Sequence, residues 1–221
     1  MEIWLDTVNA AVIKDAAQMG ILHGITTNPS IAGASGLCLE ELLENLLTLQ
    51  PGPVTVQVTT TKSETMLVQA RALHALSPRI MVKIPVSAEG LKAIHALGQE
   101  GIATMATAIF DSNQILLAAR AGATYLAPYF SKICENDVDG LDVFKSMLRL
   151  LRHYNFPSKL LAASLQSAEQ LRECAEVGAH AVTLKDRVFQ EFVQEHPSTT
   201  ECIERFAKDW SGAVPPKLLP L

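Results

Sequence analysis

Short apolar runs and longer amphipathic stretches alternate eight times along this chain. Each short run is typical of a buried parallel strand, and each longer stretch is typical of a helix with one apolar face. Eight strand-then-helix units in succession predict a closed (β/α)8 barrel, the TIM barrel fold of the α/β class. The expected strands are residues 2–6, 24–26, 54–58, 80–84, 103–107, 125–128, 160–163 and 181–184, and the expected helices are residues 9–19, 39–49, 63–76, 88–99, 112–121, 141–154, 168–177 and 187–195.

The length of the chain suits one such barrel. With 221 residues and 48% hydrophobic content, it has the apolar material for a single large core. There is no linker or low-complexity tract, so we expect one domain over residues 1–221, with 199–212 as an additional C-terminal helix and 213–221 as a tail. A doubly wound sheet is the alternative, but it usually has a glycine-rich first turn, whereas residues 6–9 read DTVN.

Turn residues support these boundaries. Gly101, Gly122 and Gly178 each follow an expected helix, at the position where a left-handed cap favours glycine. Ser87 and Asp111 each precede an expected helix, where a short polar side chain caps the free backbone N–H groups.

Charge and cysteine usage exclude several classes of protein. A net charge of −5 and a pI near 5.7 argue against nucleic-acid and anionic-membrane binding. No apolar run approaches the roughly 18 residues of a membrane span, and residues 1–6 lack signal-peptide form, so we expect a cytoplasmic protein. The four cysteines are scattered and the six histidines show no ligand spacing, so we expect no metal and no cofactor.

Lys83 lies inside one of the expected strands, in the run IMVKIP at residues 80–85. A lone ammonium has no structural role there, and burial lowers the pKa of a lysine because it disfavours the charged form. A partly neutral lysine is a nucleophile that forms a Schiff base with a carbonyl substrate. The alternative is a lysine that reaches from the strand end to solvent.

Polar residues collect where the expected strands end. The active site of a barrel lies at the carboxyl ends of its strands, so these residues predict a common site. Thr26, Asn28 and Ser164 are candidates for substrate binding, and the last two suit hydroxyl recognition because their side chains both donate and accept. The residues at the strand ends are Asp6, Thr26, Asn28, Gln57, Lys83, Thr107, Tyr129 and Ser164.

These residue types suffice to break a carbon–carbon bond. The Lys83 amine adds to a ketone and loses water, and the resulting iminium ion draws electrons from the neighbouring carbon–carbon bond. We expect Asp6 to take the proton from the hydroxyl whose carbon becomes an aldehyde. A water held by Gln57, Thr107 and Tyr129 would carry protons to and from the intermediates.

Five sequence words carry a resemblance to a known family. They are LDT at 5–7, GITTNPS at 24–30, VKIPV at 82–86 with EGL at 89–91, APY at 127–129 and LAAS at 161–164. In these words the chain resembles the small transaldolase family, most closely its fructose-6-phosphate aldolase branch. The resemblance implies that Lys83 is the Schiff-base lysine and Asp6 the catalytic carboxylate. It also implies a metal-free barrel, a sugar or sugar-phosphate substrate, and a homo-oligomer, often a decamer whose C-terminal helices pack on neighbouring subunits.

Two departures from the family pattern affect the expected phosphate site. The aldolase branch usually carries Asn-Arg after the APY word, whereas this chain has Ser131 and Lys132. Lys132 keeps the charge expected to bind phosphate but lacks the two-pronged guanidinium. After Ser164 the family usually has an aromatic and a basic residue, whereas residues 165–166 are LQ. We therefore expect a weaker phosphate site and an aldehyde partner that is poorly phosphorylated or unphosphorylated.

Gln57 and Tyr129 match the aldolase branch, because transaldolases typically carry Glu and Phe there. The resemblance thus implies a class I aldolase that reversibly cleaves a ketose or its phosphate to dihydroxyacetone and an aldehyde such as glyceraldehyde 3-phosphate. Two alternatives stay open: a transaldolase that transfers the dihydroxyacetone unit, and an inactive barrel that serves as a binding module. Lys185, at the end of the eighth strand, is an alternative amine or a supplement to the phosphate site.

The expected C-terminal helix has an apolar stripe. Its members recur at helical spacing, which is typical of a helix that packs against another surface. We expect the stripe to contribute to a contact between subunits, and the alternative is a helix folded back over its own barrel. The stripe consists of Cys202, Ile203, Phe206 and Trp210.

Overall fold

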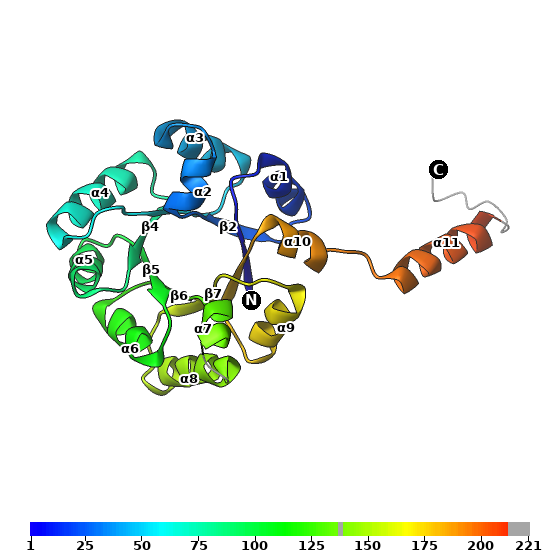
Figure 1. Cartoon of the computed structure of the whole chain (residues 1–221). Coiled ribbons are helices and arrows are strands. Elements are labelled where there is room, and N and C mark those ends of the chain that lie inside the picture. The colour runs from blue at the N-terminus through cyan, green and yellow to red at the C-terminus, as the bar shows by residue number, and fades with distance from the viewer. Residues whose placement is uncertain (137–138, 212–221) are drawn as a thin grey trace.

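Eight parallel strands close into a barrel in their chain order in the computed structural model, which describes residues 1–136 and 139–211 (Figure 1). Pairing of the first strand with the eighth closes the barrel. The predicted (β/α)8 fold is therefore confirmed. The strands are β1 (Glu2–Asp6), β2 (Leu22–Thr26), β3 (Val54–Gln57), β4 (Ile80–Pro85), β5 (Thr104–Ile109), β6 (Tyr125–Pro128), β7 (Lys159–Ala162) and β8 (Ala181–Leu184).

Helices surround the strands because each connection between parallel neighbours must cross the outside of the barrel. After each strand, one helix buries its apolar face on the sheet. These helices are α1 (Ala10–Gln18), α3 (Leu39–Leu49), α4 (Ser63–Leu76), α5 (Ala88–Gln99), α6 (Ser112–Ala121), α8 (Gly140–His153), α9 (Ala168–Glu176) and α10 (Asp186–Phe192).

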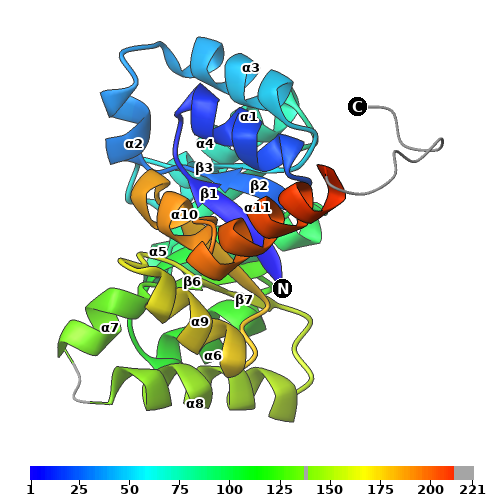
Figure 2. The same ribbon diagram turned by 90° about the vertical axis from the view of Figure 1, so that its right-hand side faces the viewer.

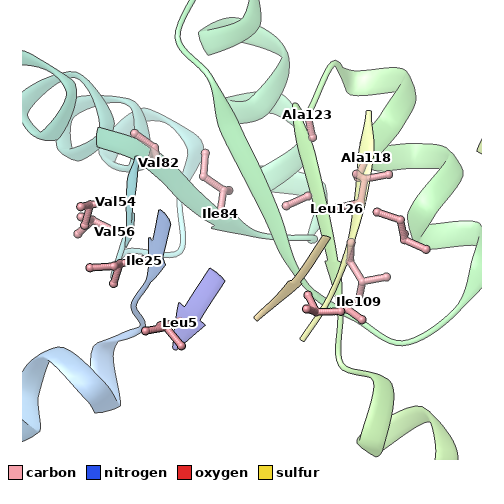
Figure 3. Close-up of a cluster of buried hydrophobic side chains, with 14 of the residues drawn as sticks. Leu5, Ile25, Val54, Val56, Val82, Ile84, Ile109, Ala118, Ala123 and Leu126 are labelled. Atoms are coloured by element: carbon pink, nitrogen blue, oxygen red, sulfur yellow. The ribbon is translucent and has the colours of Figure 1, made fainter. Parts of the chain in front are cut away.

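Alternation along the strands divides the buried side chains between two cores. Residues such as Val54, Val56, Val82 and Ile84 face outward and pack beneath the helices (Figure 3). Burying each such side chain stabilises the fold by about 1.5–3 kcal/mol. The residues between them face into the barrel, where a smaller core is formed by Trp4, Met81, Met105, Tyr125, Ala127, Leu161, Ala163 and Ala181.

The expected caps are present. Gly101, Gly122 and Gly178 have φ values of 75°, 98° and 91°, in the left-handed region that a side chain would strain. The Ser87 side chain accepts a hydrogen bond from the Gly90 N–H at the start of α5. Asp111 forms a complete capping box at the start of α6.

Two short helices were not predicted. α2 (Pro29–Ala34) follows β2, and α7 (Phe130–Asn136) follows β6. Helices of six or seven residues are too short to show a helical period in sequence, although Asn28 followed by proline at the first helical position is a start signal. Both lie on the side of the barrel opposite the N-terminus, as Figure 2 shows, which is the side where the strands end.

The end of the chain differs in detail from the prediction. α10 ends at Phe192 rather than at residue 195, because Gln194 and Glu195 offer no apolar side chain to bury. The C-terminal helix α11 (Pro197–Ser211) begins two residues early, with a proline whose fixed φ suits a first helical turn. Residue 212 of the expected helix and the tail at 213–221 lie outside the described residues.

α11 stands apart from the ring of helices (Figure 1). None of its described residues is buried, and Ile203, Phe206 and Trp210 expose about half or more of their surface. The alternative in which this helix folds back over its own barrel is therefore wrong for this structure. Among the described residues, no helix is both long and apolar enough to cross a membrane.

Candidate active site

Lys83 lies in the C-terminal half of β4, and its surface is 3% exposed. Its Nζ donates a hydrogen bond to the backbone carbonyl of Thr27 over 3.1 Å. Burial lowers the pKa of this lysine below 10.5, and the nearby Asp6 carboxylate offsets the effect only in part. The lysine does not reach solvent, so it has the environment expected of an amine nucleophile.

Asp6 ends β1 and accepts a hydrogen bond from the first of two linked hydroxyl groups. Thr26 Oγ1, on β2, donates to Asp6 Oδ1 over 2.8 Å. The same Thr26 oxygen lies 2.7 Å from Thr183 Oγ1, on β8. β2 and β8 are the two neighbours of β1 in the barrel, so the three side chains span three adjacent strands.

Tyr129 directly follows β6 and lies beside Thr107, which is two residues before the end of β5. Thr107 Oγ1 donates to the Tyr129 hydroxyl over 3.3 Å, and the Phe110 ring packs edge-on against the Tyr129 ring with centroids 5.5 Å apart. Gln57 is the residue of β3 that pairs with Lys83 in register. Gln57 therefore lies on the strand next to Lys83, whereas Tyr129 follows β6, two strands away on the other side.

Local structure restricts Asn28 and Ser164, the two residues expected to recognise substrate hydroxyl groups. Asn28 Oδ1 caps α2 by accepting hydrogen bonds from the backbone N–H groups of Ser30 and Ile31, both over 3.0 Å. Ser164 has φ 64°, in the left-handed region, which costs a non-glycine residue roughly 1–3 kcal/mol. Backbone strain of this size is often found at functional sites, so it fits a residue whose hydroxyl must be aimed.

The basic residues of the rim are partly engaged by protein groups. Lys132 lies on α7, where its Nζ contacts Glu135 Oε2 over 2.6 Å with both side chains about half exposed. Arg187 Nη2 donates to the backbone carbonyl of Gln166 over 2.6 Å, and Lys185 is exposed before α10. Lys132 therefore does not extend a free charge towards the barrel axis in this structure.

Comparison with solved structures shows the fold alone. Two structures of mandelate oxidase match 93% of the chain at 12% identity, with TM-scores of 0.58 and 0.59, over 70% and 71% of their own lengths. Such low identity carries no argument about chemistry.

Comparison with sequences is decisive. The family described as transaldolase/fructose-6-phosphate aldolase matches residues 3–214. The chain belongs to this family. It is 37% identical over 212 residues to a probable transaldolase of Caulobacter sp. (strain K31), covering 96% of this chain and 97% of that protein. It is 38% identical over 212 residues to one of Halalkalibacterium halodurans, covering 96% and 100%. The resemblance read from the sequence words is therefore confirmed, and the chain is an enzyme of the class I aldolase type.

Two parts of this family member's site were not found from sequence. The Thr27 carbonyl that holds Lys83 belongs to the backbone and leaves no signal in residue type. Thr183 did leave one, because it is a polar residue within the buried strand AVTL at 181–184. That is the same kind of signal that singled out Lys83, but a threonine is common in strands and a lysine is not.

An apolar cavity of about 260 Å³ adjoins the rim next to α2. Asn28 and Gln57 contribute polar groups to its wall, and the remaining lining is mostly apolar. The cavity lining includes Ala32, Leu37, Leu39, Leu42 and Val56.

Proposed function

We propose that this protein is a Schiff-base aldolase that reversibly cleaves a ketose or ketose phosphate to dihydroxyacetone and an aldehyde such as glyceraldehyde 3-phosphate. The observation that carries the proposal is the burial of Lys83, which lowers its pKa and so favours the neutral, nucleophilic amine. Membership of the transaldolase/fructose-6-phosphate aldolase family supports a sugar-phosphate substrate.

The residues divide the reaction between them. Lys83 Nζ adds to the ketone carbon, and water leaves to give an iminium ion. Asp6 takes the proton of the hydroxyl next to the bond that breaks, that oxygen forms the aldehyde carbonyl, and the bonding electrons move into the iminium. The enamine that remains on Lys83 is then protonated on carbon, and water releases dihydroxyacetone. The hydroxyl of Tyr129, held by Thr107 over 3.3 Å, supports the protonation step.

Borohydride trapping tests the covalent step. The protein is incubated with fructose 6-phosphate, reduced and digested, and the adduct is located by mass spectrometry. We expect the sugar-derived mass on Lys83, no adduct in Lys83→Met, and an unchanged adduct in the matched control Lys185→Met. An adduct that moves to Lys185, or none with any ketose, would contradict the proposal.

Transaldolase activity is the second candidate, because the curated relatives are named probable transaldolases. The two reactions share the enamine and differ in what it meets next, a proton or a second aldose. We propose that release dominates, because Tyr129 supplies a hydroxyl that a phenylalanine would lack. Release of dihydroxyacetone slower than transfer from fructose 6-phosphate to erythrose 4-phosphate would overturn this choice.

The phosphate group of the aldehyde is proposed to contribute little to binding. The ion pair between Lys132 and Glu135 supports this, because a phosphate would have to displace the carboxylate to reach the lysine. Competition assays between glyceraldehyde and glyceraldehyde 3-phosphate in the synthetic direction test the point. We expect kcat/KM values for the two aldehydes within about tenfold of each other. An ion pair between the phosphate and the exposed Lys132 would contribute only about 0–1 kcal/mol to binding.

We also propose that α11 packs on another subunit, with a decamer as the expected assembly. Ile203, Phe206 and Trp210 leave an apolar face that the described residues of the same chain do not bury. Light scattering on Phe206→Asp should show a smaller species than the unaltered protein. Val68→Asp, which also replaces an exposed apolar residue, serves as the control and should leave the mass unchanged. A monomer at micromolar concentration before any substitution would contradict the proposal.

A further inference from the structure

Thr183 is a buried hydroxyl that the reaction outlined above does not use. It lies on β8 in register with Trp4, and it is 3% exposed. Its Oγ1 lies 2.7 Å from Thr26 Oγ1, which in turn lies 2.8 Å from Asp6 Oδ1. Three polar groups from β8, β2 and β1 thus form one continuous chain that ends on the carboxylate.

The direction of these hydrogen bonds follows from the number of protons. A carboxylate oxygen only accepts, and a threonine hydroxyl has a single proton to donate. Thr26 therefore donates its proton to Asp6, and the remaining hydrogen bond must run from the Thr183 hydroxyl to the Thr26 oxygen. Thr183 is therefore the first donor in this series of hydrogen bonds. Its proton fixes the orientation of the Thr26 hydroxyl, which in turn donates to Asp6.

Such a chain has two consequences for Asp6. Each hydrogen bond polarises the next, so the bond from Thr26 to Asp6 is strengthened by the one from Thr183. The bond also fixes Oδ1 of Asp6 against β2, which leaves Oδ2 as the oxygen for a substrate proton. Without Thr183, the Thr26 hydroxyl is free to rotate and to turn its proton away from Asp6.

We propose that Thr183 is a positioning residue that acts through Thr26 to hold Asp6 ready for carbon–carbon bond cleavage. The inference rests on the function proposed above. The step it serves moves a proton from the substrate hydroxyl to Asp6 Oδ2, turns the hydroxyl oxygen into an aldehyde carbonyl, and sends the bonding electrons to the iminium nitrogen of Lys83. Formation of the iminium itself does not need that proton transfer.

The test separates the two steps. Thr183→Val removes the hydroxyl at nearly constant shape, and Thr183→Ser keeps it. Thr104→Val is a matched control, because Thr104 is a strand threonine, 1% exposed, whose Oγ1 has no hydrogen-bond partner among the described residues. For each full-length variant, borohydride trapping on Lys83, kcat and KM for ketose cleavage, and the melting temperature are measured.

We expect Thr183→Val to lower kcat about tenfold, the size of a lost hydrogen bond in a network that holds a charged group. KM and the rate of trapping should stay within about twofold, Thr183→Ser should restore kcat to within about twofold, and Thr104→Val should match the unaltered protein. If Thr183→Val does not fold, Thr183→Cys carries the same comparison, because a thiol is a weak donor.

Two results would overturn the inference. One is a Thr183→Val enzyme with unchanged kcat, and the other is an equal loss in trapping and cleavage, which indicates a general structural role. Failure of the proposed function looks different, because the unaltered protein then gives neither an adduct on Lys83 nor cleavage of any ketose.

Discussion

The same strands build two different halves of the barrel interior. The lower half, towards the N-terminal ends of the strands, is mostly apolar, and the upper half, towards their C-terminal ends, is polar. In β4, Met81 packs in the apolar core inside the barrel and Lys83 follows two residues later, and in β5 Met105 packs in the same core and Thr107 follows two residues later. A step of two residues along a strand keeps the side chain inside the barrel but moves it up one layer. Apolar packing therefore changes to a polar site within two residues.

The two halves also differ in the surroundings of their charged side chains, of which Glu2 is partly buried and Lys83 is buried. Glu2, at the lower end, accepts hydrogen bonds from Tyr125 over 2.7 Å and from Lys159. Burial alone would raise the pKa of this glutamate, but these partners outweigh burial and lower it. Among the described residues, the Thr27 carbonyl is the only hydrogen-bond partner of the Lys83 side chain, and burial lowers the pKa of Lys83. Hydrogen-bond donors therefore favour the charged form of Glu2, whereas burial disfavours the charged form of Lys83.

Replacing Lys83 with methionine should have the largest effect, because it removes the charged side chain that distinguishes the upper half from the lower half. We expect cleavage to fall by more than about a thousandfold, because the proposed mechanism has no other amine that forms the covalent intermediate. Folding stability at pH 7 should rise, because the burial that lowers the lysine pKa opposes folding at every pH below the ordinary value of 10.5. Kinetic assays and thermal melts check both outcomes. Appreciable turnover in this variant, or a lower melting temperature than the unaltered protein, would contradict the contrast between the halves.

Substitution of Met105 tests the lower half on the same strand that carries Thr107. Met105→Ala should lower the free energy of unfolding by about 2–5 kcal/mol through the cavity it leaves. Met105 pairs with Lys83 in register but carries no polar group, so the activity of the remaining folded protein should change by less than about fivefold. Thr107→Val is the matched variant, with reduced kcat and nearly unchanged stability. Denaturant titration with assays on the folded fraction distinguishes them, and the reverse pattern would show that the halves are not separate.

Tyr129→Phe sharpens the account of the upper half. Loss of the hydroxyl held by Thr107 should slow release of dihydroxyacetone by about a hundredfold, the ordinary size of a general-acid effect. Transfer to erythrose 4-phosphate should then gain relative to release, because the enamine survives longer. Product ratios by chromatography measure this, with Tyr154→Phe, an exposed tyrosine, as the control. An unchanged ratio would remove Tyr129 from the protonation step.

The smallest expected effect concerns Glu2. Its pKa in the folded protein lies below the ordinary 4.5, so its contribution to stability is fully present above pH 4.5 and is lost as pH falls through the lowered value. Glu2→Gln should reduce stability at pH 7 by about 1 kcal/mol and flatten this acid dependence. Unfolding curves between pH 7 and about pH 3 check the sign. Equal acid sensitivity in both proteins would show that Glu2 is not the group that titrates.

Local chemistry alone determined much of this protein. Alternating runs gave the barrel, because eight buried parallel strands need eight covering helices. Lys83 was found because a lysine in an apolar strand has few structural explanations, and Gly122 because a left-handed cap excludes most side chains. These features depend on residues near one another in sequence, so their signals survive without the fold.

Tertiary structure decided the rest. Glu2 meets Lys159, and Thr26 meets Thr183, each across 157 positions in the chain, and no local pattern pairs them. The Thr27 carbonyl that holds Lys83 is invisible in residue type, since every residue carries one. Which partner a buried polar group finds depends on how the strands are placed around the closed barrel, because hydrogen bonds need their two atoms within about 3 Å.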